Sequence, residues 1–287
     1  MKNWLLLLTV ILSHSINSDS QSLGKERVER LRKSVVRVIT RGGTGTAFFV
    51  RDNGALITCW HVVSPAVTRD KKTNQITAID TIYIVLNNGS RYEAEIYPYY
   101  LSKGYVNALV YDYCLLLPKN IPKSAFQTLK VGKFSDINDG DELYSCGYPL
   151  NMKQQFISKG ILSTKYKDTI LGWNAHNDTF IHPRELAILD ITLNHGNSGG
   201  PIIKLADKPE NDEVIGIADF IITPYGEDIK NVTEQSLNAG VNLQTFDAKG
   251  NVSMSLMGNI ALISEALSNS SVGISGCVSI DYFLHER

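Results

Sequence analysis

Short apolar runs rich in Val, Ile and Thr recur along this chain between Gly, Asn, Asp and Pro, and this spacing constrains the fold more than any other feature. The candidate strands cover 34–39, 47–50, 55–58, 81–86, 91–96, 112–117, 142–146, 156–163, 179–181, 186–192, 201–204 and 214–222. The Gly- and Thr-rich segment 42–46 is expected to be a turn, and only 258–268 near the end again has helical spacing. About a dozen short strands at such intervals predict an all-β barrel or sandwich.

The first residues differ from the rest of the chain. Lys2 carries a positive charge, and 4–12 is an almost wholly apolar run followed by small serines. This pattern predicts a signal peptide over 1–18, with cleavage between about 15 and 20. An uncleaved membrane anchor is the alternative, but the apolar run is far shorter than the about 20 residues that a spanning helix needs. We therefore expect a secreted protein, or a periplasmic one in a bacterium, with no membrane contact after signal removal.

The composition bears on the kind of partner. Hydrophobic residues make up 43% of the chain, enough for a substantial core, and 28 Lys and Arg balance 29 Asp and Glu. A net charge of −1 provides no field that would gather nucleic acid. The expected partner is a protein or peptide, and the oligomeric state is left open.

The chain has four cysteines: Cys59, Cys114, Cys146 and Cys277. Export permits disulfides, but four cysteines allow three complete pairings. Cys59 lies two residues before His61, and Cys114 lies two after Asp112, so these cysteines come close if those residues meet. One expectation is therefore a Cys59–Cys114 disulfide. The alternative is that all four cysteines are unpaired and serve as small buried hydrophobic residues. The absence of a CxxC spacing gives a zinc site little support.

The strongest local signal is the segment Gly196–Pro201, Gly-Asn-Ser-Gly-Gly-Pro. Glycines on both sides of Ser198 permit a tight turn that exposes the hydroxyl and points successive N–H groups inward. If Ser198 is a nucleophile, the amides of Gly196 and Ser198 would form an oxyanion hole. An ordinary Gly/Ser loop is the alternative.

A serine nucleophile needs a base that is itself oriented by a third group. His61 stands out because it lies between the strand 55–60 and Val62, a polar imidazole among apolar neighbours. Asp112 opens the apolar run 113–118, and a carboxylate there is expensive to bury without a partner. The two residues are the candidate base and orienting acid, although a structural core histidine would give the same pattern.

Together these segments resemble the trypsin-like serine proteases, in the branch of HtrA/Deg and the glutamyl-endopeptidase-like enzymes. The matching segments occur in the same order along the chain: 43–50, 55–63, 112–117, 147–149, 160–163, 196–201 and 214–217. The order His, Asp, Ser is that of the chymotrypsin fold. An α/β-hydrolase esterase is excluded because its triad follows a different chain order and because this sequence lacks the Gly-x-Ser-x-Gly motif of that fold.

The resemblance implies two packed six-stranded antiparallel β-barrels with a short C-terminal helix. We expect an N-terminal arm or short helix over 19–33 and a protease domain over 34–268. Within it, the first barrel takes about 34–125, the second about 126–255 and the helix about 258–268, and 269–287 is a tail. Only about 44 residues follow Leu243, so we expect no PDZ domain of the kind that HtrA-like proteins usually carry.

The resemblance also implies the chemistry. Asp112 would orient His61, which would take the Ser198 proton as the hydroxyl attacks a peptide carbonyl, with no metal or organic cofactor. A catalytically silent relative that serves as a binding module is the alternative from another class.

Regulation and specificity are expected to differ from those of the digestive enzymes. Asn197 stands where they have an aspartate that pairs with a new N-terminus, so no zymogen switch of that kind is expected. The resemblance implies that Thr192 lies near the floor of the substrate pocket and that Asp219 and Phe220 run beside the substrate backbone; with His195 they are the candidate substrate-binding residues. Because the pocket floor has no acidic residue, we expect the substrate residue before the cleaved bond to have a small or medium uncharged side chain. The alternative is that His195 binds an acidic side chain at that position. Five sequons, at Asn88, Asn177, Asn231, Asn251 and Asn269, would matter only in a eukaryotic secretory pathway.

Overall fold

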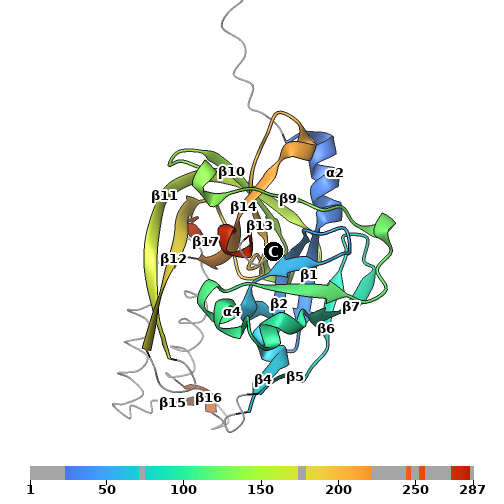
Figure 1. Cartoon of the computed structure of the whole chain (residues 1–287). Coiled ribbons are helices and arrows are strands. Elements are labelled where there is room, and N and C mark those ends of the chain that lie inside the picture. Colours follow the sequence, from blue (N-terminus) through green and yellow to red (C-terminus); the bar gives the residue numbers. More distant parts are fainter. Residues whose placement is uncertain are drawn as a thin grey trace, which may run out of the picture.

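The computed structural model describes residues 23–70, 75–173, 179–221, 244–246, 252–255 and 273–284. Two β-barrels lie side by side, the first drawn in blue to green and the second mostly in yellow-green to red (Figure 1). This confirms the predicted all-β, two-barrel architecture. The predicted signal peptide and the helix expected over 258–268 lie outside the described residues.

The first barrel is a closed ring of six antiparallel strands in the order β1-β2-β3-β8-β7-β6. Its strands are β1 (Val35–Thr40), β2 (Gly43–Phe49), β3 (Leu56–Thr58), β6 (Ile82–Val85), β7 (Arg91–Ile96) and β8 (Cys114–Pro118). Each was predicted within a residue or two except β2, whose first half was expected to be a turn. Glycine is needed there because a Cβ on Gly45 would lie 2.5 Å from the Val62 side chain.

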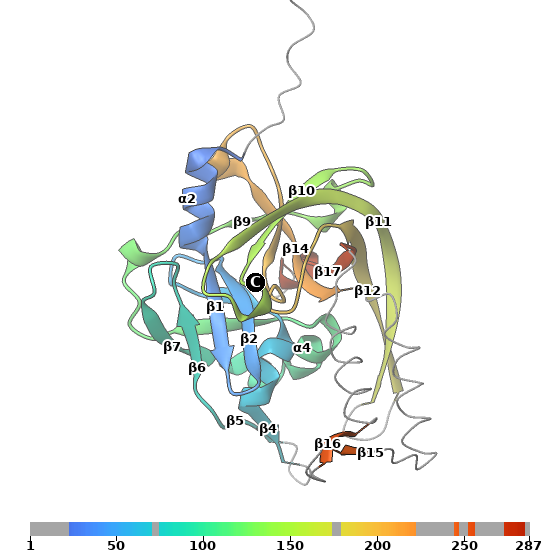
Figure 2. The same cartoon turned by 180° about the vertical axis from the view of Figure 1, so that it is seen from behind.

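The second barrel closes through six antiparallel strands in the order β13-β10-β11-β12-β17-β14, with β14 pairing back to β13. These strands are β10 (Glu142–Gly147), β11 (Phe156–Trp173), β12 (Thr179–Asp190), β13 (Pro201–Lys204), β14 (Glu213–Ile221) and β17 (Ser275–Ser279). The short strand β9 (Lys130–Val131) adds to β14 in parallel. Strands β11 and β12 form a long hairpin that projects from the barrel (Figure 2).

Strand β17 corrects the expectation that the barrel ends at about 255 and that 269–287 is a tail. It lies between β12 and β14 and is needed to close the ring. The sequence Ser-Gly-Cys-Val-Ser has no bulky alternating pattern, so it did not look like a strand. Small residues are required here because a Cβ on Gly276 would lie 1.9 Å from the Phe220 ring.

Short helices and turns precede, join or follow the strands of the two barrels. The α-helices are α2 (Gly24–Ser34), α3 (Trp60–Val63), α4 (Tyr105–Tyr111) and α7 (Asp281–Leu284). The 3₁₀ turns are η1 (Ser64–Ala66), η2 (Pro98–Leu101), η3 (Lys123–Ala125), η4 (Phe134–Asp136), η5 (Pro149–Asn151) and η6 (Pro209–Asn211). Two small hairpins pair β4 (Val67–Arg69) with β5 (Ile76–Ala78) and β15 (Gln244–Phe246) with β16 (Val252–Ser255). No helix in the described part of the chain is long and apolar enough to cross a membrane.

The hydrophobic core runs across the boundary between the barrels. One cluster of buried side chains includes Phe48 and Leu56 of the first barrel together with Tyr148 and Ile217 of the second. A second cluster, including Leu162 and Ile215, fills the interior of the second barrel. Because the first cluster is continuous, burial of apolar surface holds the two barrels together and fixes the residues at their junction.

Candidate active site

His61 lies on α3, the short helix that follows β3. Its helical neighbours Trp60, Val62 and Val63 are buried, whereas 48% of the His61 side chain is exposed. The apolar neighbours thus anchor the helix, and the imidazole is the group left free to face the junction between the barrels. This is the placement that a base working on an external substrate requires.

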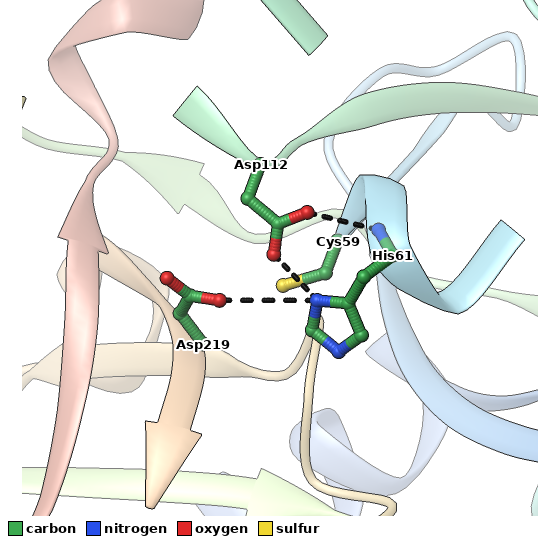
Figure 3. A group of neighbouring side chains, drawn as sticks. All are labelled: Cys59, His61, Asp112 and Asp219. Atoms are coloured by element: carbon green, nitrogen blue, oxygen red, sulfur yellow. Dashed lines mark hydrogen bonds and ion pairs between the residues drawn. The ribbon is translucent and has the colours of Figure 1, made fainter. Parts of the chain in front are cut away.

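Asp112 follows α4 in a left-handed backbone conformation, with φ 49° and ψ 46°. Asp is one of the few residues that adopt this region without a severe penalty. The conformation turns both its carbonyl and its carboxylate toward α3. The carbonyl accepts from the Trp60 N–H at 3.2 Å, Oδ1 accepts from the His61 N–H at 2.9 Å, and Oδ2 lies 2.5 Å from His61 Nδ1 (Figure 3).

Asp219 adds a second carboxylate to this pair. It comes from β14, at a point where the register against β17 shifts, so that Ala218 pairs with Cys277 and Phe220 with Gly276. Asp219 is thus the extra residue of a β-bulge, a device that re-aims one side chain. Its Oδ1 lies 3.8 Å from His61 Nδ1, and Figure 3 shows the carboxyl groups of Asp112 and Asp219 approaching the same ring nitrogen.

These three groups shift each other's pKa. Burial lowers the pKa of His61, but the hydrogen bond and charge of Asp112, with the charge of Asp219, raise it above its ordinary value. Burial acts to raise the pKa of Asp112, but hydrogen bonds from His61 and Asp219 bring it below its ordinary value. Burial, with the hydrogen bond and charge of Asp112, raises the pKa of Asp219 to about 8. The arrangement therefore favours an ionised Asp112 beside a protonated Asp219.

Ser198 lies in the loop between β12 and β13, which the two predicted glycines allow to turn tightly. Gly196 has φ +98° and Gly199 has φ +86°. A Cβ on Gly196 would lie 2.3 Å from the Tyr148 carbonyl oxygen, and one on Gly199 would lie 2.2 Å from that of Thr46. The loop is pinned to the first barrel because the Thr46 N–H donates to the Ser198 carbonyl at 2.9 Å.

The Ser198 hydroxyl donates to the Asp219 carbonyl at 3.4 Å. In the described part of the chain no hydrogen bond joins it to His61. The Asp219 residue nevertheless links the two, since its carbonyl contacts the hydroxyl and its carboxyl lies near the imidazole. Hydrogen bonds of a catalytic site are often long or differently paired before substrate binds.

The backbone around Ser198 leaves two donors open. The N–H groups of Asn197, Gly199 and Gly200 donate to carbonyls of Asn194, Ala218 and Asn197. The N–H groups of Gly196 and Ser198 donate to no carbonyl in the described part of the chain. These are the two donors that the sequence predicted for an oxyanion hole.

Two contacts that the sequence did not predict hold this backbone. The Thr46 hydroxyl donates to the Gly196 carbonyl at 2.6 Å and accepts from the Tyr148 N–H at 3.1 Å. The Leu150 N–H donates to the His195 carbonyl at 2.6 Å. Because the carbonyls on either side of the Gly196 N–H are both engaged, that N–H is kept in place. Thr46 lies in the Gly-Thr-Gly-Thr segment, whose repeated hydroxyls were the signal that could have revealed it.

The other predicted substrate-binding residues lie in different surroundings. His195 is exposed and lines a cavity of about 320 Å³ with Thr44, Leu150, Asn151 and Gly196. Thr192 is exposed at the end of β12. Phe220 packs over Gly276 between β14 and β17, so its ring forms part of the barrel wall.

The cysteines are all free and buried, so the expected Cys59–Cys114 disulfide is wrong. In the β3–β8 register Thr58, and not Cys59, stands opposite Cys114. Alternation along the strand therefore turns Cys59 to the other face, where its thiol donates to the Ala218 carbonyl at 3.2 Å.

Four side chains with metal-ligating atoms, Cys59, His61, Asp112 and Asp219, have those atoms within 4.8 Å of one another. Burial raises the pKa of the Cys59 thiol and keeps it protonated. His61 and Asp112 bind each other. These donors are engaged with the protein, so the arrangement fits a hydrogen-bonded relay better than a metal centre.

Comparison with known proteins agrees with this geometry. A family model described as a trypsin-like peptidase domain matches residues 45–217. The human serine protease HTRA4 is 28% identical over 208 residues, which is 68% of this chain and 36% of that protein. The magnetosome formation protease MamE of Paramagnetospirillum magneticum is 30% identical over 182 residues, 63% of this chain and 20% of that protein. The chain thus spans about a third or less of these relatives.

Solved structures show the same fold at lower identity. The HtrA-type protease AlgW with a bound decapeptide aligns with a TM-score of 0.50 and 17% identity, over 91% of this chain and 65% of that one. An inactive form of Rv3671c from M. tuberculosis aligns with a TM-score of 0.50 and 16% identity, over 71% of this chain and 82% of that one.

Proposed function

The chain belongs to the trypsin-like peptidase family, and on that premise we propose that it is a serine endopeptidase with His61, Asp112 and Ser198 as its catalytic triad. One observation carries the proposal: the doubly bound Asp112–His61 pair faces a tight Gly196–Pro201 loop with two open N–H donors. A silent structural scaffold has no need of an exposed imidazole clamped in this way.

In the proposed reaction, substrate binding turns the Ser198 hydroxyl from the Asp219 carbonyl toward His61 Nε2. His61 takes the hydroxyl proton as the oxygen attacks the peptide carbonyl, and Asp112 stabilises the imidazolium through Nδ1–H. The N–H groups of Gly196 and Ser198 stabilise the negative charge on the tetrahedral oxygen, and losing one such donor costs about 10²–10³-fold in kcat.

The second half of the reaction uses the same groups. His61 gives its proton to the leaving amine, which departs and leaves an acyl ester on Ser198. Water then enters, and His61 takes one of its protons as it attacks the ester. Collapse of this second intermediate returns the proton to Ser198 and releases the new carboxylate.

The proposed substrate is a polypeptide outside the cytoplasm. AlgW has been solved with bound peptides, and the similar Rickettsia conorii protein is named a probable periplasmic serine endoprotease. The apolar leader over 4–12 supports export of this chain as well. For the residue before the cut we propose a small or medium uncharged side chain. A peptide library tests this preference. Cleavage mainly after Arg or Lys would refute it. Cleavage after acidic residues that is lost in His195→Ala would show instead that His195 binds an acidic side chain.

The decisive experiment labels the purified chain with a fluorophosphonate and maps the modified peptide. We expect modification of Ser198, abolished in His61→Ala, because the label requires an activated serine. Thermal unfolding of each variant checks that it is folded. A folded wild-type chain that takes up no label would instead support the silent relative that acts as a binding module.

A further inference from the structure

Asp219 is the feature of this site that the triad does not use. If the proposed protease function holds, Asp112 and His61 are both assigned, yet a third ionisable side chain enters the same junction. Only 13% of the Asp219 side chain is exposed. A β-bulge aims it at the relay instead of at the barrel wall. A carboxylate oxygen of Asp219 and one of Asp112 lie within 4.8 Å of each other. Two carboxyl groups so close together need a compensating proton or cation.

In the described part of the chain, the one fixed cation that acts on Asp219 is Arg184, and it is shared with another carboxylate. The ionisable groups there that act on Asp219 or feel its charge are Asp112, His61, Cys59, Cys277, Tyr166 and Arg184. Cys59 and Cys277 are buried thiols, and Tyr166 is a phenol, so none of them is positive. Arg184 already binds Asp168 at 3.1 Å. His61 carries a charge only when it is protonated.

We propose that Asp219 is a positioning residue of the relay, a neutral carboxylic acid whose O–H donates a hydrogen bond to the Asp112 carboxylate and so holds that carboxylate against His61. The proton stays on Asp219 throughout the reaction. Asp112 keeps one negative charge, shared between the Asp219 O–H, the His61 backbone N–H and Nδ1–H. Three donors on one carboxylate fix its orientation, and the orientation of the His61 ring that it binds is fixed with it.

This role makes activity depend on pH in a defined direction. The pKa of Asp219 is raised to about 8 by burial and by the hydrogen bond and charge of Asp112. As the pH rises through that value Asp219 loses its proton, and two adjacent carboxylates repel each other. The hold on Asp112 is lost, so kcat should fall at alkaline pH, where an ordinary enzyme of this kind keeps its deprotonated His61 active.

The test compares Asp219→Asn and Asp219→Ala with the wild type across the pH range. Asn keeps an N–H donor toward Asp112 that does not titrate, so its alkaline loss of kcat should disappear. Ala removes the donor, so kcat should fall about tenfold at neutral pH with KM nearly unchanged. The matched control is Asp207→Asn, an exposed carboxylate on the loop after β13, which should keep the wild-type profile. An alkaline loss that persists in Asp219→Asn would overturn the proposal.

A second readout separates this proposal from the proposed function. The low-field proton resonance of the His61 Nδ1–H can be followed by NMR in the folded chain, whether or not it cleaves peptides. We expect its position to shift as Asp219 titrates in the wild type and to stay constant over that range in Asp219→Asn. If the chain shows this shift but takes up no label at Ser198, the proposed protease function is refuted and the hydrogen bond from protonated Asp219 to Asp112 is supported. Activity that falls on addition of EDTA would mean that a bound cation, and not a proton on Asp219, neutralises the two carboxylates, and would refute the proposal.

Discussion

The Asp112 carboxylate binds His61 twice, through the backbone N–H at 2.9 Å and through Nδ1 at 2.5 Å. The first contact fixes where the residue lies, and the second fixes which ring nitrogen carries the proton. Both depend on the left-handed backbone of Asp112, which also lets its carbonyl accept from Trp60. The relay is therefore built from backbone geometry as much as from side chains.

Asp112→Asn tests this relationship. The amide preserves shape but donates to Nδ1, which forces the proton to the wrong ring nitrogen. We expect kcat to fall about 10⁴-fold with little change in KM. Steady-state kinetics with a peptide substrate measures it, with Asp207→Asn as the matched control. A loss below tenfold would mean that Asp112 does not orient the base.

Thr46 is predicted to support the oxyanion hole. Thr46→Val removes the hydroxyl that joins the Gly196 carbonyl to the Tyr148 N–H, and leaves two buried groups unpaired. Each unpaired group costs about 1–3 kcal/mol, so the melting temperature and kcat should both fall. Thr46→Ser restores the hydroxyl and should recover most of kcat. If Ser and Val behave alike, the hydroxyl has no role in holding Gly196.

Gly199 and Gly89 form a matched pair for the serine loop, because both have φ +86°. Nothing lies within 4 Å of a Cβ on Gly89, whereas one on Gly199 would lie 2.2 Å from the Thr46 carbonyl oxygen. Gly89→Ala should cost about 1–2 kcal/mol for the backbone alone. Gly199→Ala should cost about 1–3 kcal/mol more for the clash. Urea unfolding measures both, and equal losses would show that the loop relaxes freely.

Strands β7 and β13 match their predicted ranges of 91–96 and 201–204, the first by its alternation and the second as a short buried apolar run. The long hairpin was predicted only in part: β11 was expected to end at 163, and β12 was expected as two strands, 179–181 and 186–192. Helix α4 was missed because Val106 and Leu109 are exposed, so its apolar residues do not follow a helical stripe. Strand β17 was missed for the opposite reason, since its small residues are chosen to fit Phe220. The need for small residues in β17 comes from the Phe220 ring on the neighbouring strand β14, and the sequence of β17 alone does not show which ring it packs against.

The candidate site was predictable to the extent that each residue has a local signature. Ser198 lies between glycines, and His61 and Asp112 interrupt apolar runs. Asp219 also interrupts an apolar strand, and this was a signal that it needs a partner. Its side-chain direction depends on a one-residue register shift against β17, which no local pattern predicts.

The stability of the chain should also report the state of Asp219. Its pKa is raised to about 8 in the folded protein by burial and by Asp112, so the folded state binds more protons than the unfolded one between about pH 4 and about pH 8. Its contribution to the free energy of unfolding is fully present below its ordinary pKa and is lost as the pH rises toward 8. Asp112 acts oppositely, since its lowered pKa gives stability that is lost only as the pH falls into the acid range.

Urea unfolding at about pH 5 and about pH 8 measures this difference, because the window lies between the ordinary and the raised pKa of Asp219. The raised pKa of His61 adds a loss in the same direction, since its stabilisation is present when it is protonated and declines as the pH rises. The wild type should therefore lose more stability between the two pH values than Asp219→Asn, which keeps only the His61 part. Equal losses in the two proteins would show that Asp219 is already ionised at pH 5, and its place beside Asp112 would then need a bound cation to explain it.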